Sequence, residues 1–187
     1  MRHAVLAYSG GVDSSLLLRA AAEVIAPRLI AVTAVSETYP ISELPGAREF
    51  AGSLGVKHTI LHTGELSSED FVRNAPDRCY HCKRELFEKL RRIAVEEGMT
   101  SVIEGSNMDD LRDYRPGRTA AQEFGVRSPL VEAGFSKAEV RECARMLDLP
   151  VWDKPSLACL SSRIPYGTRI TSGILRTIEA AEDHIRR

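Results

Sequence analysis

The 187-residue chain contains 43% hydrophobic and 27% charged residues and has a formal net charge of -1. This length and composition predict one globular unit with a real core, and the near-neutral charge argues against a global field that would attract tRNA or an anionic membrane. No apolar run approaches the roughly 18 residues of a membrane span or the core of a signal peptide. We therefore expect a cytoplasmic protein that binds neither membrane nor nucleic acid.

Apolar runs and helical periodicity alternate along the chain in the manner of βα units. We expect strands at 3–8, 29–36, 57–62, 101–104 and 126–131, and helices at 14–26, 42–54, 80–97, 118–124, 136–147 and 172–187. The predicted fold class is α/β, with a five-stranded parallel sheet flanked by helices. Residues 1–150 would form this domain, and residues 151–187 a loop and the start of a C-terminal segment that we expect to continue further.

The string SGGVDSS, residues 9–15, lies between the first strand and the first helix. There, backbone N–H groups and the positive end of the helix can hold a phosphate, and glycines let the backbone approach it closely. The string lacks the Lys-Ser/Thr ending of a Walker A loop and is not G-x-G-x-x-G. Without a lysine, it suits a leaving or bridging phosphate group.

The candidate residues of this loop divide by chemistry. Asp13 offers the oxygen ligands that Mg²⁺ requires. A cradle for pyrophosphate would consist of Ser9, Gly10, Gly11, Ser14 and Ser15. The alternative interpretation is a tight strand–helix turn that Asp13 caps.

A second polar group follows the fourth predicted strand, at the sheet edge where α/β proteins bind ligands. Glu104, Asn107 and Asp110 are the candidates there, and helix or loop capping is the alternative role. Arg115 and Arg163 carry the positive charge that would neutralise an adenylate or a substrate phosphate. Simple solvent exposure is the alternative for both arginines.

Four cysteines occur in the chain, and a reducing compartment favours their use in metal binding or catalysis over disulfides. Cys79 and Cys82 begin a predicted helix, whose N-terminus would lower their thiol pKa values. Zinc would need two further ligands, which the histidines supply poorly, and a thioredoxin-type pair would directly follow the first strand. Cys143 lies on the apolar stripe of its helix, which predicts a buried structural residue. Cys159 lies in a loop of small and polar residues near Arg163.

Two levels of resemblance follow from these motifs. SGGVDSS resembles the signature of the PP-loop ATP pyrophosphatases, which split ATP into AMP and pyrophosphate. The strings RCYHCK, EGSNMDDLRDYRPG, GVRSPLVEAGFSKAEVR and WDKPSLACLSSRIPYG occur in the same order as in the LarE family. LarE-type proteins are ATP-dependent sulfur transferases that mature the nickel-pincer cofactor of lactate racemase.

The resemblance implies an activity. A carboxylate of pyridinium-3,5-biscarboxylic acid mononucleotide would be adenylated with ATP and Mg²⁺ and then converted to a thiocarboxylate. In one group of family members, a cysteine matching Cys159 gives up its own sulfur. In the other, that cysteine and a Cys-x-x-Cys together hold an iron–sulfur cluster. This chain carries all three thiols, which implies a [4Fe–4S] cluster on Cys79, Cys82 and Cys159, with Cys159, Asp13 and Arg163 as catalytic residues.

The same resemblance implies cofactor-maturation partner proteins and a homo-oligomer. Other classes share parts of this pattern. A tRNA thiolase would use the same activation, but a basic face or an RNA-binding domain would be expected. An NAD or GMP synthetase would use ammonia and need no three-cysteine set, and a nucleotide sensor of the universal-stress type would release no pyrophosphate.

Overall fold

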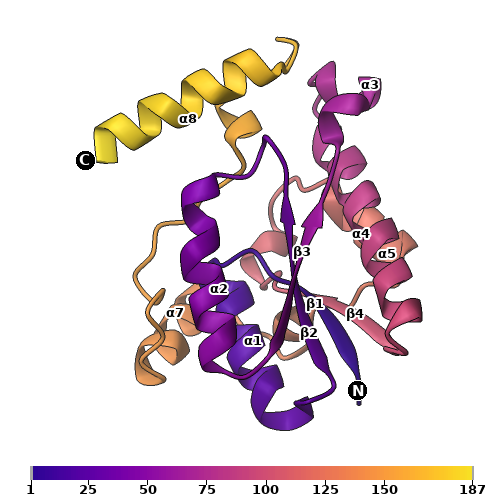
Figure 1. Cartoon of the computed structure of the whole chain (residues 1–187), viewed down its shortest axis with the longest axis vertical. Coiled ribbons are helices and arrows are strands. Elements are labelled where there is room, and N and C mark those ends of the chain that lie inside the picture. The colour runs from indigo at the N-terminus through magenta and orange to yellow at the C-terminus, as the bar shows by residue number, and fades with distance from the viewer. Residues whose placement is uncertain (1, 187) are drawn as a thin grey trace.

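The computed structural model describes residues 2–186 (Figure 1). Within that part of the chain, four strands form the sheet: β1 (Ala4–Ala7), β2 (Leu29–Val35), β3 (Lys57–His62) and β4 (Ser101–Glu104). Their order is β3-β2-β1-β4, and every neighbouring pair is parallel. The predicted α/β class with a parallel sheet is confirmed.

The helices of the described chain match the predicted ones within a few residues, and two short ones were not expected. They are α1 (Val12–Ile25), α2 (Leu44–Ser53), α3 (Glu69–Val72), α4 (Arg78–Glu96), α5 (Gly117–Glu123), α6 (Pro129–Glu132), α7 (Lys137–Met146) and α8 (Ser172–Arg186). Short 3-10 turns occupy Ile41–Glu43, Glu65–Ser67, Asp109–Leu111 and Leu160–Arg163. Ser136 and Glu139 form a capping box at the start of α7, as their spacing predicts.

The predicted fifth strand at 126–131 is wrong. Arg127 makes one isolated parallel bridge to Ile103 and two backbone hydrogen bonds with the neighbouring residues of β4. The pairing stops because Pro129 has no N–H group and occupies the start of α6, a position that suits proline. The apolar residues of this run therefore form a helix start rather than a strand, and the sheet has four strands.

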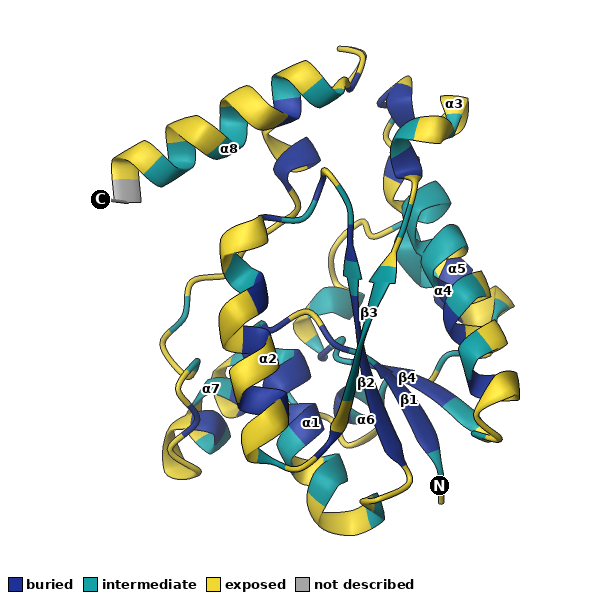
Figure 2. Ribbon diagram, viewed as in Figure 1, coloured by how far each residue is buried: buried dark blue, intermediate teal, exposed yellow. Residues whose placement is uncertain are grey.

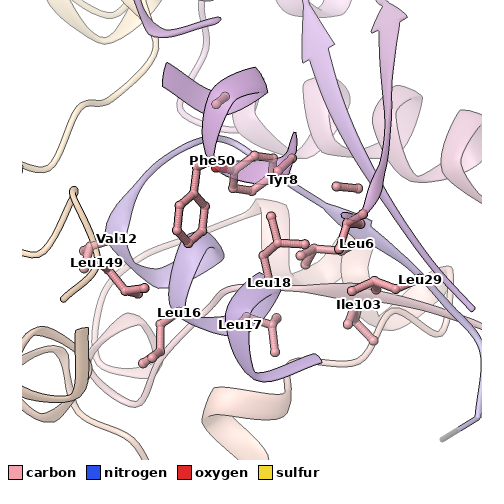
Figure 3. Close-up of a cluster of buried hydrophobic side chains, with 14 of the residues drawn as sticks. Leu6, Tyr8, Val12, Leu16, Leu17, Leu18, Leu29, Phe50, Ile103 and Leu149 are labelled. Carbon is pink, nitrogen blue, oxygen red and sulfur yellow. The ribbon is translucent and has the colours of Figure 1, made fainter. Parts of the chain in front are cut away.

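Helices cover both faces of the sheet because alternate strand residues point to opposite sides. On β1, Ala4 and Leu6 belong to the core under α1, α2 and α7, whereas Val5 belongs to the core under α4 and α5. Figure 2 shows the buried strands between these two helical layers. Figure 3 shows the first core, in which Leu6, Leu18 and Leu29 lie together.

The strand order creates a switch point between β1 and β4. From β1 the chain moves outward to β2 and β3, and it returns to the other side of β1 for β4. Gly105, directly after β4, packs closely against the segment that follows β1. A Cβ added at Gly105 would lie only 2.9 Å from the backbone nitrogen of Ser14. Ligands of α/β proteins bind at such a point.

A third, smaller core lies beyond the carboxyl ends of β2 and β3, where α3 and α8 occupy the same end of the molecule (Figure 1). It joins α3, the turn Leu160–Arg163 and α8 through Phe71, Val72, Leu160, Ile164, Ile170 and Leu175. The loop predicted from residue 151 onward thus contains an ordered turn, Leu160–Arg163, that anchors it. No helix within residues 2–186 has the length and apolar character to cross a membrane.

Candidate active site

The first turn of α1 offers its backbone N–H groups to a ligand. The helix begins at Val12, with Gly11 at the N-cap position and no side chain capping it. The alternative that Asp13 caps this turn is therefore wrong. Gly10 has a φ of +77°, which favours glycine, and it lets the loop turn sharply before the helix. Uncapped N–H groups at a helix N-terminus form a site for an anion such as a phosphate.

The three serines of this loop have different surroundings. The hydroxyl oxygens of Ser9 and Ser14 lie 3.1 Å apart, and the Ser14 hydroxyl donates to the Gly11 carbonyl at 3.1 Å. Ser15 is fully buried, and its hydroxyl lies 3.4 Å from the hydroxyl of Tyr8. Ser9 therefore lies on the loop surface, Ser14 is buried directly beneath it, and Ser15 packs into the core.

The candidate residues after β4 join the loop through one hydrogen-bond network. Asn107 Nδ2 donates to Asp13 Oδ1 at 2.9 Å, and the Asn107 backbone N–H donates to Asp110 Oδ2 at 3.0 Å. Arg115 Nη1 pairs with Asp110 Oδ1 at 2.8 Å. The structure thus brings Asp13, Asn107, Asp110 and Arg115 together, as their expected position at one sheet edge predicts.

Glu104 faces the helix that carries the cysteine pair. Its carboxylate is buried, and Oε1 accepts a hydrogen bond from the Ser128 hydroxyl at 2.7 Å. The other oxygen, Oε2, lies 4.0 Å from Lys83 Nζ on α4. Glu104 therefore links the end of β4 to α4, apart from the Asp13 network.

The SGGVDSS segment, residues 9–15, is called the phosphate loop from here on. Two lysines that the sequence analysis missed supply positive charge to it. Lys137, the first residue of α7, forms an ion pair with Asp13. Lys154 donates to the Gly10 carbonyl at 3.3 Å and forms an ion pair with Glu43. Both come from segments distant in sequence, so local patterns gave no signal for their position. The loop lacks its own lysine but is flanked by two.

We expect Lys154→Ala to weaken binding of ATP and of pyrophosphate about tenfold and to leave AMP binding unchanged, because the lost ammonium neutralises the leaving phosphates. Isothermal titration with the three ligands measures the effect. Lys57→Ala is the matched control, since Lys57 pairs with Glu97 on the exposed surface at 2.7 Å. Equal weakening of AMP and ATP would contradict a role at the pyrophosphate.

Cys159 lies near Cys79 and Cys82 although 77 residues separate it from Cys82 in sequence. Desolvation by the surrounding protein raises the pKa of the Cys159 thiol, the nearby Cys79 raises it further, and Arg78 opposes both. The pKa of the Cys82 thiol also responds to the charges of Cys159 and Cys79. Such mutual effects require proximity. All four cysteines are free thiols, and Cys143 is partly buried against the first core.

The expectation that the helix N-terminus lowers the thiol pKa is wrong for Cys82. This residue lies in the second turn of α4 and packs against the third core. Burial raises the pKa of its thiol, and the Glu65 carboxylate, 3.8 Å from Cys82 Sγ, raises it further. Desolvation of the thiolate therefore outweighs the helix dipole. As the side chains stand in residues 2–186, no three or more His, Cys, Asp or Glu residues are arranged to hold a metal ion.

Asn74 fixes the loop that carries Cys159. It is fully buried, and its Nδ2 donates to the carbonyls of Pro165 at 2.9 Å and Thr168 at 2.8 Å. Its Oδ1 accepts from Arg78 on α4, and the Arg78 guanidinium lies 4.7 Å from the centre of the Tyr166 ring. Asn74 and Arg78 thus tie the loop to the helix of the cysteine pair, a role that sequence analysis did not assign.

Arg163 supports the same loop from its other side. Its Nη1 donates to the carbonyls of Ala158 at 2.7 Å and Cys159 at 3.2 Å, and its Nε pairs with Glu182 of α8 at 2.6 Å. The Leu160 N–H donates to the Thr38 carbonyl at 2.9 Å, in the segment after β2. The structure therefore places Arg163 beside Cys159, as predicted, and directs its guanidinium to the loop backbone and α8.

These features define a class of protein. A parallel sheet carries a Ser-Gly-Gly-x-Asp-Ser loop at its switch point, with an uncapped helix start and two lysines beside it. This is the nucleotide-binding domain of the PP-loop ATP pyrophosphatases.

Comparison with known proteins agrees with this class and narrows it. The family model for asparagine synthase matches residues 5–93. An uncharacterized protein of Synechocystis sp. is 46% identical over 98% of this chain and 69% of its own length. The pyridinium-3,5-bisthiocarboxylic acid mononucleotide synthase of Lactiplantibacillus plantarum is 36% identical over 100% of this chain and 68% of its own. The tRNA-specific 2-thiouridylase of Heliobacterium modesticaldum is 29% identical over 81% and 49%. The chain belongs to the LarE family of ATP-dependent sulfurtransferases.

Proposed function

We propose that this enzyme adenylates a carboxylate of pyridinium-3,5-biscarboxylic acid mononucleotide and converts it to a thiocarboxylate. The observation that supports the proposal is the proximity of Cys159 to Cys79 and Cys82, whose charges affect the pKa of its thiol or of each other, at the end of the sheet where the phosphate loop also lies. The Lactiplantibacillus plantarum relative, a pyridinium-3,5-bisthiocarboxylic acid mononucleotide synthase, supports the same substrate class. Delivery to cofactor-maturation partner proteins and assembly into a homo-oligomer in the cytoplasm belong to the same proposal.

The first step is transfer of AMP to the carboxylate. A carboxylate oxygen attacks the α-phosphorus, the acyl oxygen–phosphorus bond forms, and the bond to the β-phosphate breaks with release of pyrophosphate. The carboxylate is already ionised, so this step needs charge neutralisation and positioning rather than a base. The N-terminus of α1 and Lys154 neutralise the pyrophosphate, and Asp13 would hold Mg²⁺ once Lys137 moves from it to the phosphates.

The second step is sulfur transfer. Cys79, Cys82 and Cys159 have the donor chemistry of an iron–sulfur site, and Cys79 affects the thiol pKa of both other cysteines. Their side chains, which are not arranged around a metal as they stand, would have to draw together to hold a [4Fe–4S] cluster. Such a cluster, held by these three cysteines, would supply a means of holding sulfide for transfer to the substrate. Hydrosulfide attacks the acyl carbon, the carbon–sulfur bond forms, and the bond to AMP breaks. AMP leaves, and the S–H proton passes to solvent.

The test is release of pyrophosphate from ATP and Mg²⁺ with and without the pyridinium dicarboxylate. We expect substrate-dependent release, and we expect Asp13→Asn to lower it about 100-fold because the metal loses its carboxylate ligand. Asp148→Asn is the matched control, since Asp148 is exposed and its left-handed φ of +51° suits asparagine. Release that does not depend on the dicarboxylate, or that responds only to tRNA, would overturn the proposed function.

A further inference from the structure

Packing fixes the direction of Lys83, the residue that follows Cys82 on α4. An added Cβ at Gly117, the first residue of α5, would lie 2.8 Å from Lys83 Cγ. Lys83 Nζ lies 5.2 Å from the centre of the buried Phe87 ring. The aliphatic stem therefore lies against α5, and the ammonium group lies over the Phe87 ring and extends toward the end of β4.

The ammonium group of Lys83 forms a long ion pair with Glu104 and can still donate hydrogen bonds to another acceptor. The distance from Nζ to Glu104 Oε2 is 4.0 Å, which is longer than a hydrogen bond. Glu104 already accepts from the Ser128 hydroxyl through its other oxygen. An ammonium has three donors and no acceptor, so an anion that enters beside Glu104 would find donors ready.

This ammonium group also lies between the two parts of the site, which are the phosphate loop and the cysteines. On one side, Gly105 directly follows Glu104 and contacts the backbone of Ser14 in the phosphate loop. On the other side, Lys83 directly follows Cys82 on α4, and the Cys82 thiol lies 3.8 Å from the Glu65 carboxylate. In an adenylation followed by sulfur transfer, the carboxyl carbon of the substrate must occupy the position between nucleotide and sulfur.

We propose that Lys83 binds the substrate carboxylate that becomes adenylated, and that it thereby selects a carboxylate over an uncharged group. Its ammonium donates hydrogen bonds to the carboxylate oxygens and holds the acyl group between the α-phosphorus and the sulfur. The same donors face the oxygen that gains negative charge when sulfur attacks the acyl carbon. This inference rests on the proposed function and assigns the element that recognises its substrate.

The test combines a change in Lys83 with a change in the ligand. The probes are two pyridinium mononucleotides that carry either a carboxylate or a carboxamide at ring position 3, titrated in the presence of AMP. Wild-type protein is expected to bind the carboxylate about 10- to 100-fold more tightly, as a charge-assisted hydrogen bond implies. Lys83→Ala is expected to bind both probes equally and to keep its affinity for ATP.

Lys89→Ala is the matched control on the same helix, because Lys89 pairs with Glu85 at 2.7 Å and donates to the His62 carbonyl at 3.1 Å. It should keep the preference for the carboxylate. A preference that persists in Lys83→Ala, or that is absent from wild-type protein, would overturn the assignment. If the dicarboxylate releases no pyrophosphate while the preference depends on Lys83, the proposed function fails and the carboxylate site stands. Unchanged melting temperatures separate recognition from loss of folding.

Discussion

Cys159→Ser is expected to lower thiocarboxylate formation at least 100-fold while substrate-dependent pyrophosphate release continues. The serine hydroxyl is a poor ligand for an iron–sulfur cluster and has no sulfur to transfer. The phosphate loop and its lysines are unchanged in this variant, so the adenylation step should continue. Mass spectrometry of the product and a pyrophosphate assay on the same sample separate the two steps.

Cys143→Ser is the control for this variant, because Cys143 lies on α7 against the first core and away from the other thiols. It should keep thiocarboxylate formation. Full product from Cys159→Ser would contradict the assignment of Cys159. Iron and sulfide analysis after anaerobic purification tests the cluster, and full activity of Cys79→Ala would contradict it. Loss of one sulfur atom from the polypeptide during turnover would instead identify Cys159 as a sacrificial donor.

Asn74→Ala is expected to destabilise the protein by about 3–5 kcal/mol and to release the Cys159 loop. The change leaves the carbonyls of Pro165 and Thr168 and the buried guanidinium of Arg78 without their partner. It also puts alanine at a φ of +57°, in the left-handed region. Urea unfolding measures the free energy of unfolding, and limited proteolysis of the segment 159–168 measures release of the loop.

Two further variants separate the contributions at Asn74. Asn74→Gly removes the same hydrogen bonds but tolerates the positive φ, so it should lose about 1 kcal/mol less than the alanine variant. Asp148→Ala carries the backbone effect alone, because Asp148 is exposed and has a φ of +51°. A loss in Asn74→Ala no greater than that in Asp148→Ala would show that the buried hydrogen bonds contribute nothing.

Local patterns predicted most of the fold, because the buried strands and the amphipathic helices each carry their own periodicity. The pattern failed at 126–131, where apolar residues on either side of Pro129 resemble a strand but the proline opens α6. It also missed α3, whose four residues lie in a polar connection too short for a helical repeat to be recognised.

The candidate site was predictable where it depends on strand ends, and not where it depends on side chains reaching across the molecule. Asp13 and Asn107 follow β1 and β4, so parallel pairing alone brings them to one edge. Lys137 and Lys154 reach the phosphate loop only through the packing of α7 and the loop after it. The expectation that Cys159 lies near the cysteine pair came from the family resemblance, because the distance between cysteines along the sequence carries no signal for it.

The third core determines which part of the molecule unfolds first. Six apolar side chains, Phe71, Val72, Leu160, Ile164, Ile170 and Leu175, hold the Cys159 loop, apart from the larger cores of the sheet. A small satellite cluster opens at a lower free energy than the whole domain. Mild denaturant or heat will therefore release the Cys159 loop from α4 and abolish sulfur transfer while the sheet stays folded and the nucleotide still binds.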